Sequence, residues 1–335
     1  MAEKIRFLLT SVGRRASLVN FFTKELSGIG ELLLSDMSVY SAALHTGGKR
    51  VFLPGYRSED YLETLLRACD ENSVSGMASL TDYELNFLSS AKDKLKDHGV
   101  TFFGPNAEVS QKCLDKWLLS KELERLGFPF VKSYIELNEF KKALAAGELE
   151  FPVFIKPRFG SGSLNTFVAE NMREVEFYYE KYKDTIVQEY LVGDEFGVDV
   201  YRDILSGETV SIFLKKKFSM RAGETDKAVS VKTPRLFEIV EEFAYKFGIT
   251  GVADMDILYS CGEYYIFDVN PRFGGGYSLA HECGCNFPRY MLNNLRGIKN
   301  ERAIGNYKED ICMFKSDGAV FTGMNDPAFR GNLNG

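Results

Sequence analysis

The sequence predicts a protein of mixed α/β and α+β class, in which an N-terminal parallel α/β domain precedes a two-lobed module built around antiparallel strands. Over residues 4–110, short apolar runs alternate with amphipathic stretches, the order that produces a parallel sheet covered by helices. From residue 188 onward, strand-like segments follow one another around one long helical stretch, as in an antiparallel sheet. We therefore expect three units, at residues 1–112, 113–187 and 188–335.

The first unit alternates strand and helix along its length. We expect strands at 5–13, 30–36, 75–82 and 100–104, and helices at 16–27, 58–72 and 83–99. Ligands of a parallel sheet bind at the carboxyl ends of its strands, which selects residues 11–15, Asp36 and Thr81–Asp82 as candidate rim residues. The dinucleotide-binding fingerprint is absent, because "TSVGRR" has one glycine where three are needed.

The second and third units follow a bridging helix. The stretch 104–129 has an apolar face and ends at Gly127 with Pro129 just after, the usual stop signals. Residues 130–187 read as strand, helix, strand, glycine turn, strand, helix, strand. Beyond them we expect strands at 195–205, 208–220, 251–260 and 263–272, and a helix at 234–248. The polar segment 215–232 is either a substrate contact or a solvated charged loop, and the tail after Asp310 is an edge or loosely held segment.

Composition favours a small-molecule partner. The 335 residues carry a net charge of −6 with both signs mixed, which argues against a nucleic-acid-binding stripe or a membrane-surface helix. The sequence has no apolar span long enough to cross a bilayer and no leader signature, so we expect a cytoplasmic location. Six scattered cysteines indicate reduced thiols. The cluster of His281, Cys283 and Cys285 lacks a fourth ligand, and buried thiols are favoured there over a metal site.

Acidic and amide side chains converge near the end of the last long strand. Residues 268, 270 and 272 project to one side because side chains alternate along a strand, so Asp268, Asn270 and Arg272 share a patch. If the two last strands form a hairpin, Asp256 joins them, and hard oxygen ligands of this kind are those that Mg²⁺ prefers. The alternative, that Asp-x-Asn-Pro merely ends a strand, is about equally favoured by these residues alone.

The stretch "FIKPRFGSGSLNTFVAEN" places a glycine loop after a lysine. Lys156 precedes the glycines and a strand follows them, whereas in a Walker loop the lysine comes last and opens a helix. A hairpin loop is therefore expected, with Lys116 in the first turn of the bridging helix nearby. Each lysine alone is more often a surface residue, but together with the acidic patch they predict a phosphate site. The backbone of 189–191 is available to an adenine edge, and Glu195 to ribose hydroxyls.

These motifs together resemble the ATP-grasp superfamily. The ordered set is "LDKW", "FIKPRFGSGS", "QEYLVGDEFGVDV", "DMDI" and "FDVNPR", and the resemblance covers nearly the whole chain. Within that superfamily, the motifs most resemble those of stand-alone carboxylate–amine ligases, which are similar to the synthetase domains of carbamoyl-phosphate synthase large subunits. The resemblance implies that the glycine hairpin closes over the phosphates of ATP.

Roles for individual residues follow from the same resemblance. The implied ATP-binding residues are Lys116, Lys156, Gly160, Ser161, Gly162, Ser163, Gln188, Glu189, Tyr190, Leu191 and Glu195. The implied metal ligands are Asp256, Asp268 and Asn270, and the implied catalytic residues are Arg272, Asn270 and Lys156. Because aspartate stands where many relatives have glutamate, the number of Mg²⁺ ions, one or two, stays open, with Mn²⁺ as an alternative metal.

The implied reaction is phosphorylation of a carboxylate by ATP, followed by attack of an amine to give an amide. Small-molecule carboxylate and amine substrates are implied, with no nucleic acid and no membrane, and a homodimer is a family expectation. Arg221, Gly275 and Arg14 are further candidates for substrate contact. Two alternatives stay open: ATP-dependent chemistry through carboxyphosphate, and a non-catalytic nucleotide-binding subunit. An oxidoreductase is least favoured.

Overall fold

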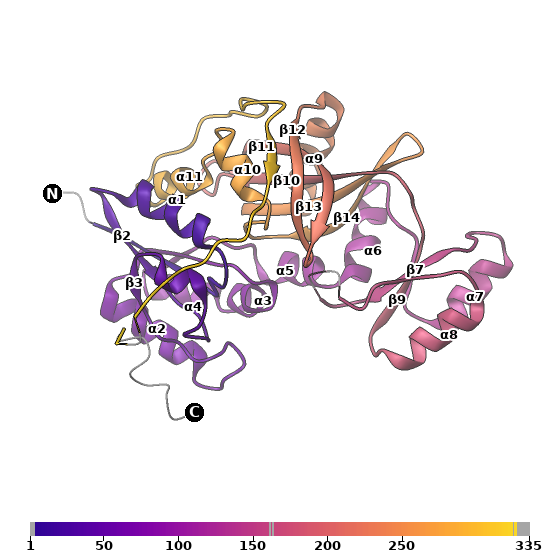
Figure 1. Ribbon diagram of the computed structural model, residues 1–335, viewed down its shortest axis with the longest axis horizontal. Helices are drawn as coiled ribbons and strands as arrows, with labels where there is room; N and C mark the ends of the chain where they lie inside the picture. The colour runs from indigo at the N-terminus through magenta and orange to yellow at the C-terminus, as the bar shows by residue number, and fades with distance from the viewer. Residues whose placement is uncertain (1–3, 161, 163, 324, 327–335) are drawn as a thin grey trace.

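Three β-sheets organise the chain (Figure 1). The computed structural model describes residues 4–160, 162, 164–323 and 325–326. The first sheet is parallel and has the strand order β3-β2-β1-β4-β5, while the small sheet (β6-β9-β7-β8) and the large sheet (β14-β13-β10-β11-β12-β15) are antiparallel. This confirms the predicted combination of a parallel α/β unit with two antiparallel lobes.

The first sheet forms from continuous apolar runs, which suit parallel strands buried on both faces. Phe7, Leu8 and Leu9 of the central strand are fully buried. The strands of this unit are β1 (Ile5–Thr10), β2 (Gly30–Leu34), β3 (Lys49–Arg50), β4 (Gly76–Ser79) and β5 (Thr101–Phe102). Its helices are α1 (Ala16–Leu26), the short 3-10 helix η1 (Ala42–His45), α2 (Tyr61–Asn72), α3 (Asp82–Ser90) and α4 (Lys92–Asp97).

The single helix expected over 83–99 is wrong, because the segment forms α3 and α4 with a break at Ala91. Ala91 has φ −100° and ψ 9°, outside the helical range, and its N–H bonds to the carbonyl of Leu88. The break lets Leu85, Leu88 and Leu95 all pack into the apolar layer under the first sheet. Packing of the two apolar faces therefore overrides the continuous helical periodicity.

The expected bridging helix is also two helices, α5 (Ala107–Leu114) and α6 (Lys116–Leu126). Asp115 between them is extended, and its buried carboxylate accepts hydrogen bonds from the N–H groups of Trp117 and Leu118. The same carboxylate pairs with Arg158 at 2.6 Å. Asp115 thus starts a new helix and places Lys116 at its first position, which agrees with the prediction that Lys116 lies in a first helical turn.

Replacing Asp115 with alanine is expected to lower the free energy of unfolding by about 2 kcal/mol. About 1 kcal/mol comes from the lost helix cap, and the remainder from a buried carboxylate pair that solvent partly screens on the Arg158 side. Urea denaturation would measure the change. Asp115→Asn, which keeps a capping oxygen but removes the charge, should lose less, and equal losses for the two variants would contradict the capping role.

The small sheet carries the glycine loop. Its strands are β6 (Ser133–Tyr134), β7 (Val153–Pro157), β8 (Phe167–Ala169) and β9 (Thr185–Glu189), with helices α7 (Leu137–Ala145) and α8 (Met172–Lys181). Strand β7 pairs antiparallel with β8, with Ile155 opposite Phe167. The loop between them is therefore a hairpin connection, as the order of Lys156 and the glycines predicted. A separate apolar cluster around Phe140 holds the helices against this sheet.

The large sheet supplies the acidic strands. Its strands are β10 (Asp194–Arg202), β11 (Thr209–Arg221), β12 (Glu224–Val231), β13 (Gly251–Ser260), β14 (Glu263–Asn270) and β15 (Cys312–Phe314). Its helices are α9 (Pro234–Phe247), α10 (Tyr277–Glu282) and α11 (Phe287–Leu295). Strand β15 is the edge strand and pairs with β12, which agrees with an edge segment in the tail.

The segment 215–232 is a β-hairpin rather than a solvated charged loop. Strand β11 continues to Arg221, turns at residues 222–223 and returns as β12. Thr225, Ala228 and Ser230 are buried, while residues 226, 227 and 229 between them are half-buried or exposed. The high charge of the segment suggested a solvated loop, but lysines 215 and 217 are buried by partners from other strands.

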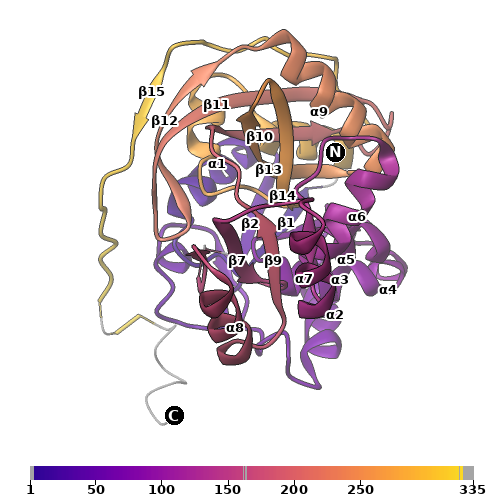
Figure 2. The same cartoon turned by 90° about the vertical axis from the view of Figure 1, so that its right-hand side faces the viewer.

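One apolar cluster joins the first sheet to the large sheet. Phe7 stacks on Phe22 at 4.8 Å between ring centroids, and Phe22 packs edge-on against Phe273 at 5.8 Å. Helix α1 lies beside α11 (Figure 1), while α9 packs on the large sheet through a different cluster (Figure 2). This packing brings the carboxyl ends of the first sheet's strands next to the segment that follows β14. In the described part of the chain, no helix is long and apolar enough to cross a membrane.

Candidate active site

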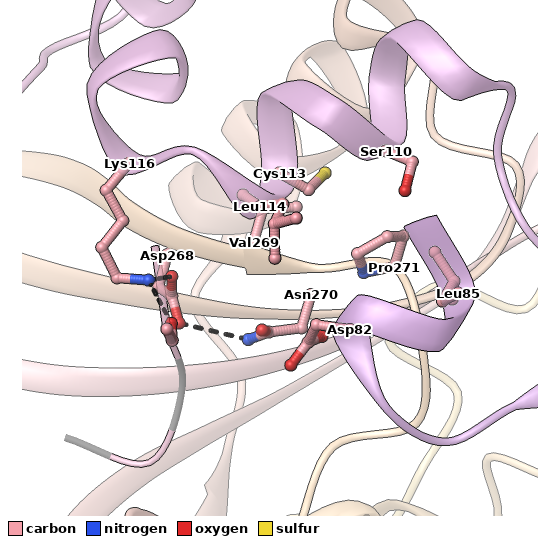
Figure 3. A pocket seen from close by; sticks show the side chains of 11 residues that line it. Asp82, Leu85, Ser110, Cys113, Leu114, Lys116, Asp268, Val269, Asn270 and Pro271 are labelled. Carbon is pink, nitrogen blue, oxygen red and sulfur yellow. Dashed lines mark hydrogen bonds and ion pairs between the residues drawn. The ribbon is translucent and has the colours of Figure 1, made fainter. Parts of the chain in front are cut away.

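The proposed metal ligands lie together on β13 and β14. The two strands pair so that Asp256 lies opposite Asp268 and Asp254 opposite Asn270. The amide of Asn270 donates to Asp268 at 3.3 Å (Figure 3). The side chains of Asp256 and Asp268 are each 20% exposed, so the patch is accessible to an ion. The hairpin predicted from the sequence therefore forms, and it adds Asp254 to the expected set.

Two lysines from other elements face this patch. Lys116 at the start of α6 lies 3.4 Å from Asp268 and donates to the carbonyl of Gly160 at 2.6 Å (Figure 3). Lys156 on β7 is buried, and its burial, followed by the charge of Lys116, lowers the pKa of Lys156 to about 8. Groups of opposite charge from four elements, α6, β7, β13 and β14, thus come together beside the start of the glycine loop.

A cavity of about 10 Å³, close to the least space that can hold a water, is lined by Lys116, Asp268 and Asn270 together with Asp82 and Gly160. Among the described residues, no group of three His, Cys, Asp or Glu side chains forms a ready metal cage. The candidate ligands are instead the carboxylates of Asp256 and Asp268 and the amide oxygen of Asn270, and the exposed side of the two carboxylates leaves space for further ligands. Mg²⁺ is commonly bound in this way, by one or two carboxylates that share it with substrate phosphates and water.

A third lysine, Lys217 on β11, binds Asp256 and was not expected from the sequence. Its Nζ lies 2.5 Å from Asp256 and 2.6 Å from Glu195. Burial alone would lower the pKa of Lys217, but the two carboxylates raise it above its usual value. Burial raises the pKa of Asp256 to about 7, against the opposing effect of Lys217. Lys217 therefore links the metal patch to the predicted ribose residue.

The predicted adenine segment ends strand β9. Gln188 is buried and donates to the hydroxyl of Ser133 at 2.6 Å. The backbone N–H of Glu189 donates to the carbonyl of Lys132, and its carboxylate accepts from the N–H of Lys132. The N–H of Glu189 is therefore not available to an adenine edge, because it already bonds to Lys132, next to strand β6, which pairs with β9. Tyr190 and Leu191 follow the strand, and the Tyr190 side chain is exposed.

The glycine loop meets the tip of the β11–β12 hairpin. Gly223 in that turn has φ +73°, and a Cβ built on it would lie 2.2 Å from the Cα of Gly162. Only glycine allows this approach, so loops from the small and the large sheet cover the patch together. Gly160 and Gly162 are described, whereas Ser161 and Ser163 lie outside the described residues.

Arg272 is held by an aspartate of the first unit. Its guanidinium pairs with both oxygens of Asp82 at 2.8 and 2.9 Å, and both side chains are nearly buried. Burial would lower the pKa of Arg272, but Asp82 raises it. Asp82 is one of the rim residues that the sequence singled out. It meets Arg272 because α3 starts at the rim that faces the end of β14.

The three further substrate candidates have different surroundings. Arg221 has a 61% exposed side chain and pairs with Asp317 at 3.0 Å. Arg14 is exposed. A Cβ on Gly275 would lie 2.7 Å from the carboxyl carbon of Glu224. Burial would raise the pKa of that carboxyl, but the charges of Arg15, Lys315 and Arg14 lower it.

The His281, Cys283 and Cys285 cluster is structural. Both thiols are buried, and burial raises the pKa of each, that of Cys285 to about 12. The ring of His281 stacks on Phe21 with 3.7 Å between centroids. Packing thus accounts for the cluster, in agreement with the prediction of buried thiols.

Two known domain families match this chain. Residues 7–103 match the PylC-like, N-terminal domain family, and residues 113–276 match the ATP-grasp domain family. The chain contains an ATP-grasp domain. Every residue of the metal patch, both flanking lysines and the glycine loop lie within that domain, and Asp82 lies within the PylC-like domain. The resemblance read from the five sequence motifs is confirmed.

Two curated relatives have similar sequences. The D-alanine–D-alanine ligase of Fusobacterium nucleatum subsp. nucleatum is 24% identical over 228 residues, which are 61% of this chain and 75% of that ligase. The carbamoyl phosphate synthase large chain of Clostridium beijerinckii is 26% identical over 196 residues, 53% of this chain. The match spans only 18% of that large chain, so its similarity to this protein concerns one part of it.

Solved structures share the fold of both matched domains. The biotin carboxylase domain of Hydrogenobacter thermophilus 2-oxoglutarate carboxylase, solved as a dimer with MgADP and bicarbonate, superposes with a TM-score of 0.74. It is 16% identical, and the match covers 92% of this chain and 74% of that one. The L-amino acid ligase of Bacillus licheniformis gives a TM-score of 0.68 at 17% identity, covering 88% and 75%. At these identities the likeness shows the fold.

Removing the charge of Lys156 is expected to weaken ATP binding and ATP turnover together. Lys156→Ala deletes a buried cation at the start of the glycine loop of the ATP-grasp domain, and a lost charged hydrogen bond typically costs roughly ten- to a hundredfold in affinity. Calorimetric titration with MgADP and steady-state kinetics would measure both. Lys181→Ala on α8 is the control, and unchanged values for Lys156→Ala would mean that the lysine only packs beneath the hairpin.

Four charged residues around this site, Asp254, Arg15, Lys217 and Glu224, were not given individual roles from the sequence. Asp254 had a clear signal, since it precedes Asp256 by two residues and so shares its face of β13. Arg15 had one too, because it belongs to the rim stretch 11–15 that was singled out. Lys217 lies in a strand that the sequence predicted and Glu224 in the polar segment after it, but neither had a signal for its partners, because strand pairing depends on distant residues.

Proposed function

We propose that the protein is an ATP- and Mg²⁺-dependent ligase that activates a small carboxylate as an acyl phosphate and joins it to an amine. The observation that carries the proposal is the meeting of opposite charges across two lobes. Asp256 and Asp268 lie opposite each other on paired strands, and Lys116 from α6 lies 3.4 Å from Asp268. Such a site attracts both a divalent cation and the phosphates that it accompanies.

The residues present fit MgATP. Asp256, Asp268 and Asn270 would hold the metal, which when bound neutralises charge that develops on the transferred phosphoryl group. Lys116 and Lys156 would hold phosphate oxygens, and the backbone of the glycine loop would cover them. Tyr190, Leu191 and Glu195 would line the nucleoside end. One or two Mg²⁺ ions are compatible with this donor set, and Mn²⁺ accepts the same oxygen ligands.

Arg272 is the residue best placed to stabilise the reacting carbonyl. Its guanidinium is nearly buried, and Asp82 fixes its orientation from the first unit. A positioned cation of this kind lowers the energy of the oxyanion that forms when an amine attacks an acyl phosphate. No side-chain nucleophile is required. Burial raises the pKa of Cys69, Cys113, Cys283 and Cys285, which agrees with thiols that stay protonated.

Two relatives named as ligases support an amino acid as substrate, the D-alanine–D-alanine ligase and the L-amino acid ligase. A second candidate is chemistry through carboxyphosphate. It is favoured by the likeness to the carbamoyl phosphate synthase large chain and to a biotin carboxylase domain that was solved with bicarbonate. Dependence of ATP hydrolysis on bicarbonate separates the two.

The first experiment is phosphate release from MgATP across pools of amino acids and other small carboxylates, with and without bicarbonate. Release stimulated by a carboxylate and an amine together would support the ligase. Release with bicarbonate alone would favour the second candidate. Binding of MgADP without turnover in any pool would favour a nucleotide-binding subunit instead.

Three further properties belong to the proposal. The unit boundaries at residues 112 and 187, a cytoplasmic location and a homodimer all follow from sequence and family expectation. Size-exclusion chromatography with light scattering would test the dimer, and limited proteolysis would test the boundaries.

A further inference from the structure

Two guanidinium groups share one carbonyl oxygen beside the metal patch. Nη1 of Arg15, at the start of α1, donates to the carbonyl of Phe273 at 3.2 Å. Nη1 of Arg272 donates to the same oxygen at 3.0 Å. Two cations that would normally repel each other are therefore held side by side, one from the first unit and one from the end of β14.

The two arginines differ in how closely a carboxylate pairs with each guanidinium. Arg272 has both oxygens of Asp82 within 2.9 Å. The carboxylate nearest to Arg15 is that of Glu224, at 3.7 Å, and Glu224 pairs more closely with Lys315, at 2.9 Å. Burial and the charge of Arg272 lower the pKa of Arg15, as expected for a cation without a close counter-ion. Since the Arg15 side chain is 20% exposed, its remaining N–H donors can reach a ligand.

Two carboxylates adjoin the same backbone. A Cβ on Gly274 would lie 2.1 Å from an oxygen of Asp254, and a Cβ on Gly275 would lie 2.7 Å from the carboxyl carbon of Glu224. The glycines thus let both carboxylates press against the segment that Arg15 and Arg272 bind. Arg15, Arg272, Glu224 and Asp254 thus cluster around residues 273–275, with Lys315 2.9 Å from Glu224 and Lys215 3.8 Å from Asp254 as further cations. Strand pairing connects Asp254 to Asn270.

From this charge pattern we propose that the amine substrate is a zwitterionic amino acid, whose carboxylate binds Arg15 and whose amino group faces Glu224 and Asp254. This proposal rests on the proposed ligase function. A simple dianion would be repelled by the two carboxylates, and a simple amine would leave Arg15 unmatched. A zwitterion of amino-acid size satisfies both, and guanidinium pairs with carboxylate through two parallel hydrogen bonds.

By binding the carboxylate of the amine substrate, Arg15 would also keep that carboxylate from being phosphorylated. The carboxylate bound to Arg15 is held away from the phosphate site, while the amino group lies on the side of Asp254 and the metal patch. There the nitrogen forms the new C–N bond, the C–O bond to phosphate breaks, and inorganic phosphate leaves with that electron pair. The protons lost by the ammonium group pass to phosphate and solvent.

Thermal shift in the presence of MgADP tests the proposal with defined probes: the common amino acids, their amides and methyl esters, and the matching simple amines. We expect at least one amino acid to raise the melting temperature of the wild-type protein, while its amide and methyl ester do not. In Arg15→Gln, we expect the affinity for that amino acid to fall roughly ten- to a hundredfold while MgADP still binds as in wild type. Arg235→Gln, an exposed arginine on α9, is the matched control.

Kinetics give a second readout that a merely structural role of Arg15 would not move. Arg15→Gln should raise KM for the amino acid at least tenfold, change kcat much less, and abolish the preference for the acid over its amide; Arg15→Lys should restore part of that preference. An unchanged preference in Arg15→Gln would overturn the proposal, as would wild-type protein that binds MgADP but none of the amino acids. Failure of wild-type protein to bind MgADP would contradict the ligase function itself, and the amino-acid site with it.

Discussion

Replacing Asp268 with asparagine is expected to lower magnesium-dependent ATP turnover roughly a hundred- to a thousandfold, the usual cost of losing one well-placed charge stabiliser. Asp268 is the one carboxylate that contacts both a predicted metal ligand, Asn270, and a predicted phosphate lysine, Lys116, among the residues described. The substitution keeps the size of the side chain and removes the anion, so the proposed metal site would lose a charged ligand and Lys116 would lose its ion pair.

Phosphate release at saturating MgATP, with the substrates found in the pool screen, would measure this effect. Glu263→Gln at the exposed start of the same strand is the matched control, because it removes one carboxylate from β14 outside the site. Circular dichroism and the melting temperature should show that both variants fold. If folded Asp268→Asn retained near-normal turnover, the metal assignment would be wrong, and Asn270→Ala should then be equally harmless.

The second large effect is expected for Arg272→Gln, with kcat reduced roughly a hundredfold or more and MgADP affinity close to that of wild type. Arg272 points to the junction with the first unit, where Asp82 holds it, and no contact ties it to Gly160 or to the phosphate lysines. Its proposed task is therefore to stabilise charge that appears only during the reaction. Asp82→Asn, which leaves the guanidinium but loosens its orientation, should cost less.

Steady-state kinetics and calorimetric titration of MgADP separate the two possible roles of Arg272. Arg289→Gln is the control, since this arginine pairs with Glu25 at the surface. A loss of MgADP affinity in Arg272→Gln comparable to that in Lys156→Ala would contradict the prediction, because it would make Arg272 a nucleotide-binding residue. Equal losses in Arg272→Gln and Asp82→Asn would show that the two side chains act as one unit.

The fold class and most of the elements could be predicted because they depend on local patterns. Continuous apolar runs such as that of β1 predict parallel strands, and the order of Lys156, glycines and a following strand predicts a hairpin. The breaks at Ala91 and Asp115 could not be predicted in the same way. At Ala91 the break follows from packing of two apolar faces, and at Asp115 from a pairing with Arg158, which lies 43 residues away in the chain.

By itself, the sequence determined which residue types the candidate site contains and which of them lie on one face of the last two long strands. Alternation along β13 and β14 put Asp256, Asp268 and Asn270 on one face, since the period of a strand is a property of the backbone. Only the tertiary structure decided the partners of these charges. Lys217 reached Asp256 through strand pairing across the large sheet, and Asp82 and Arg15 reached the end of β14 because a shared apolar core docks the first unit there. Ion pairs between distant segments follow from how hydrophobic faces pack, and that packing is not a property of any local stretch of the chain.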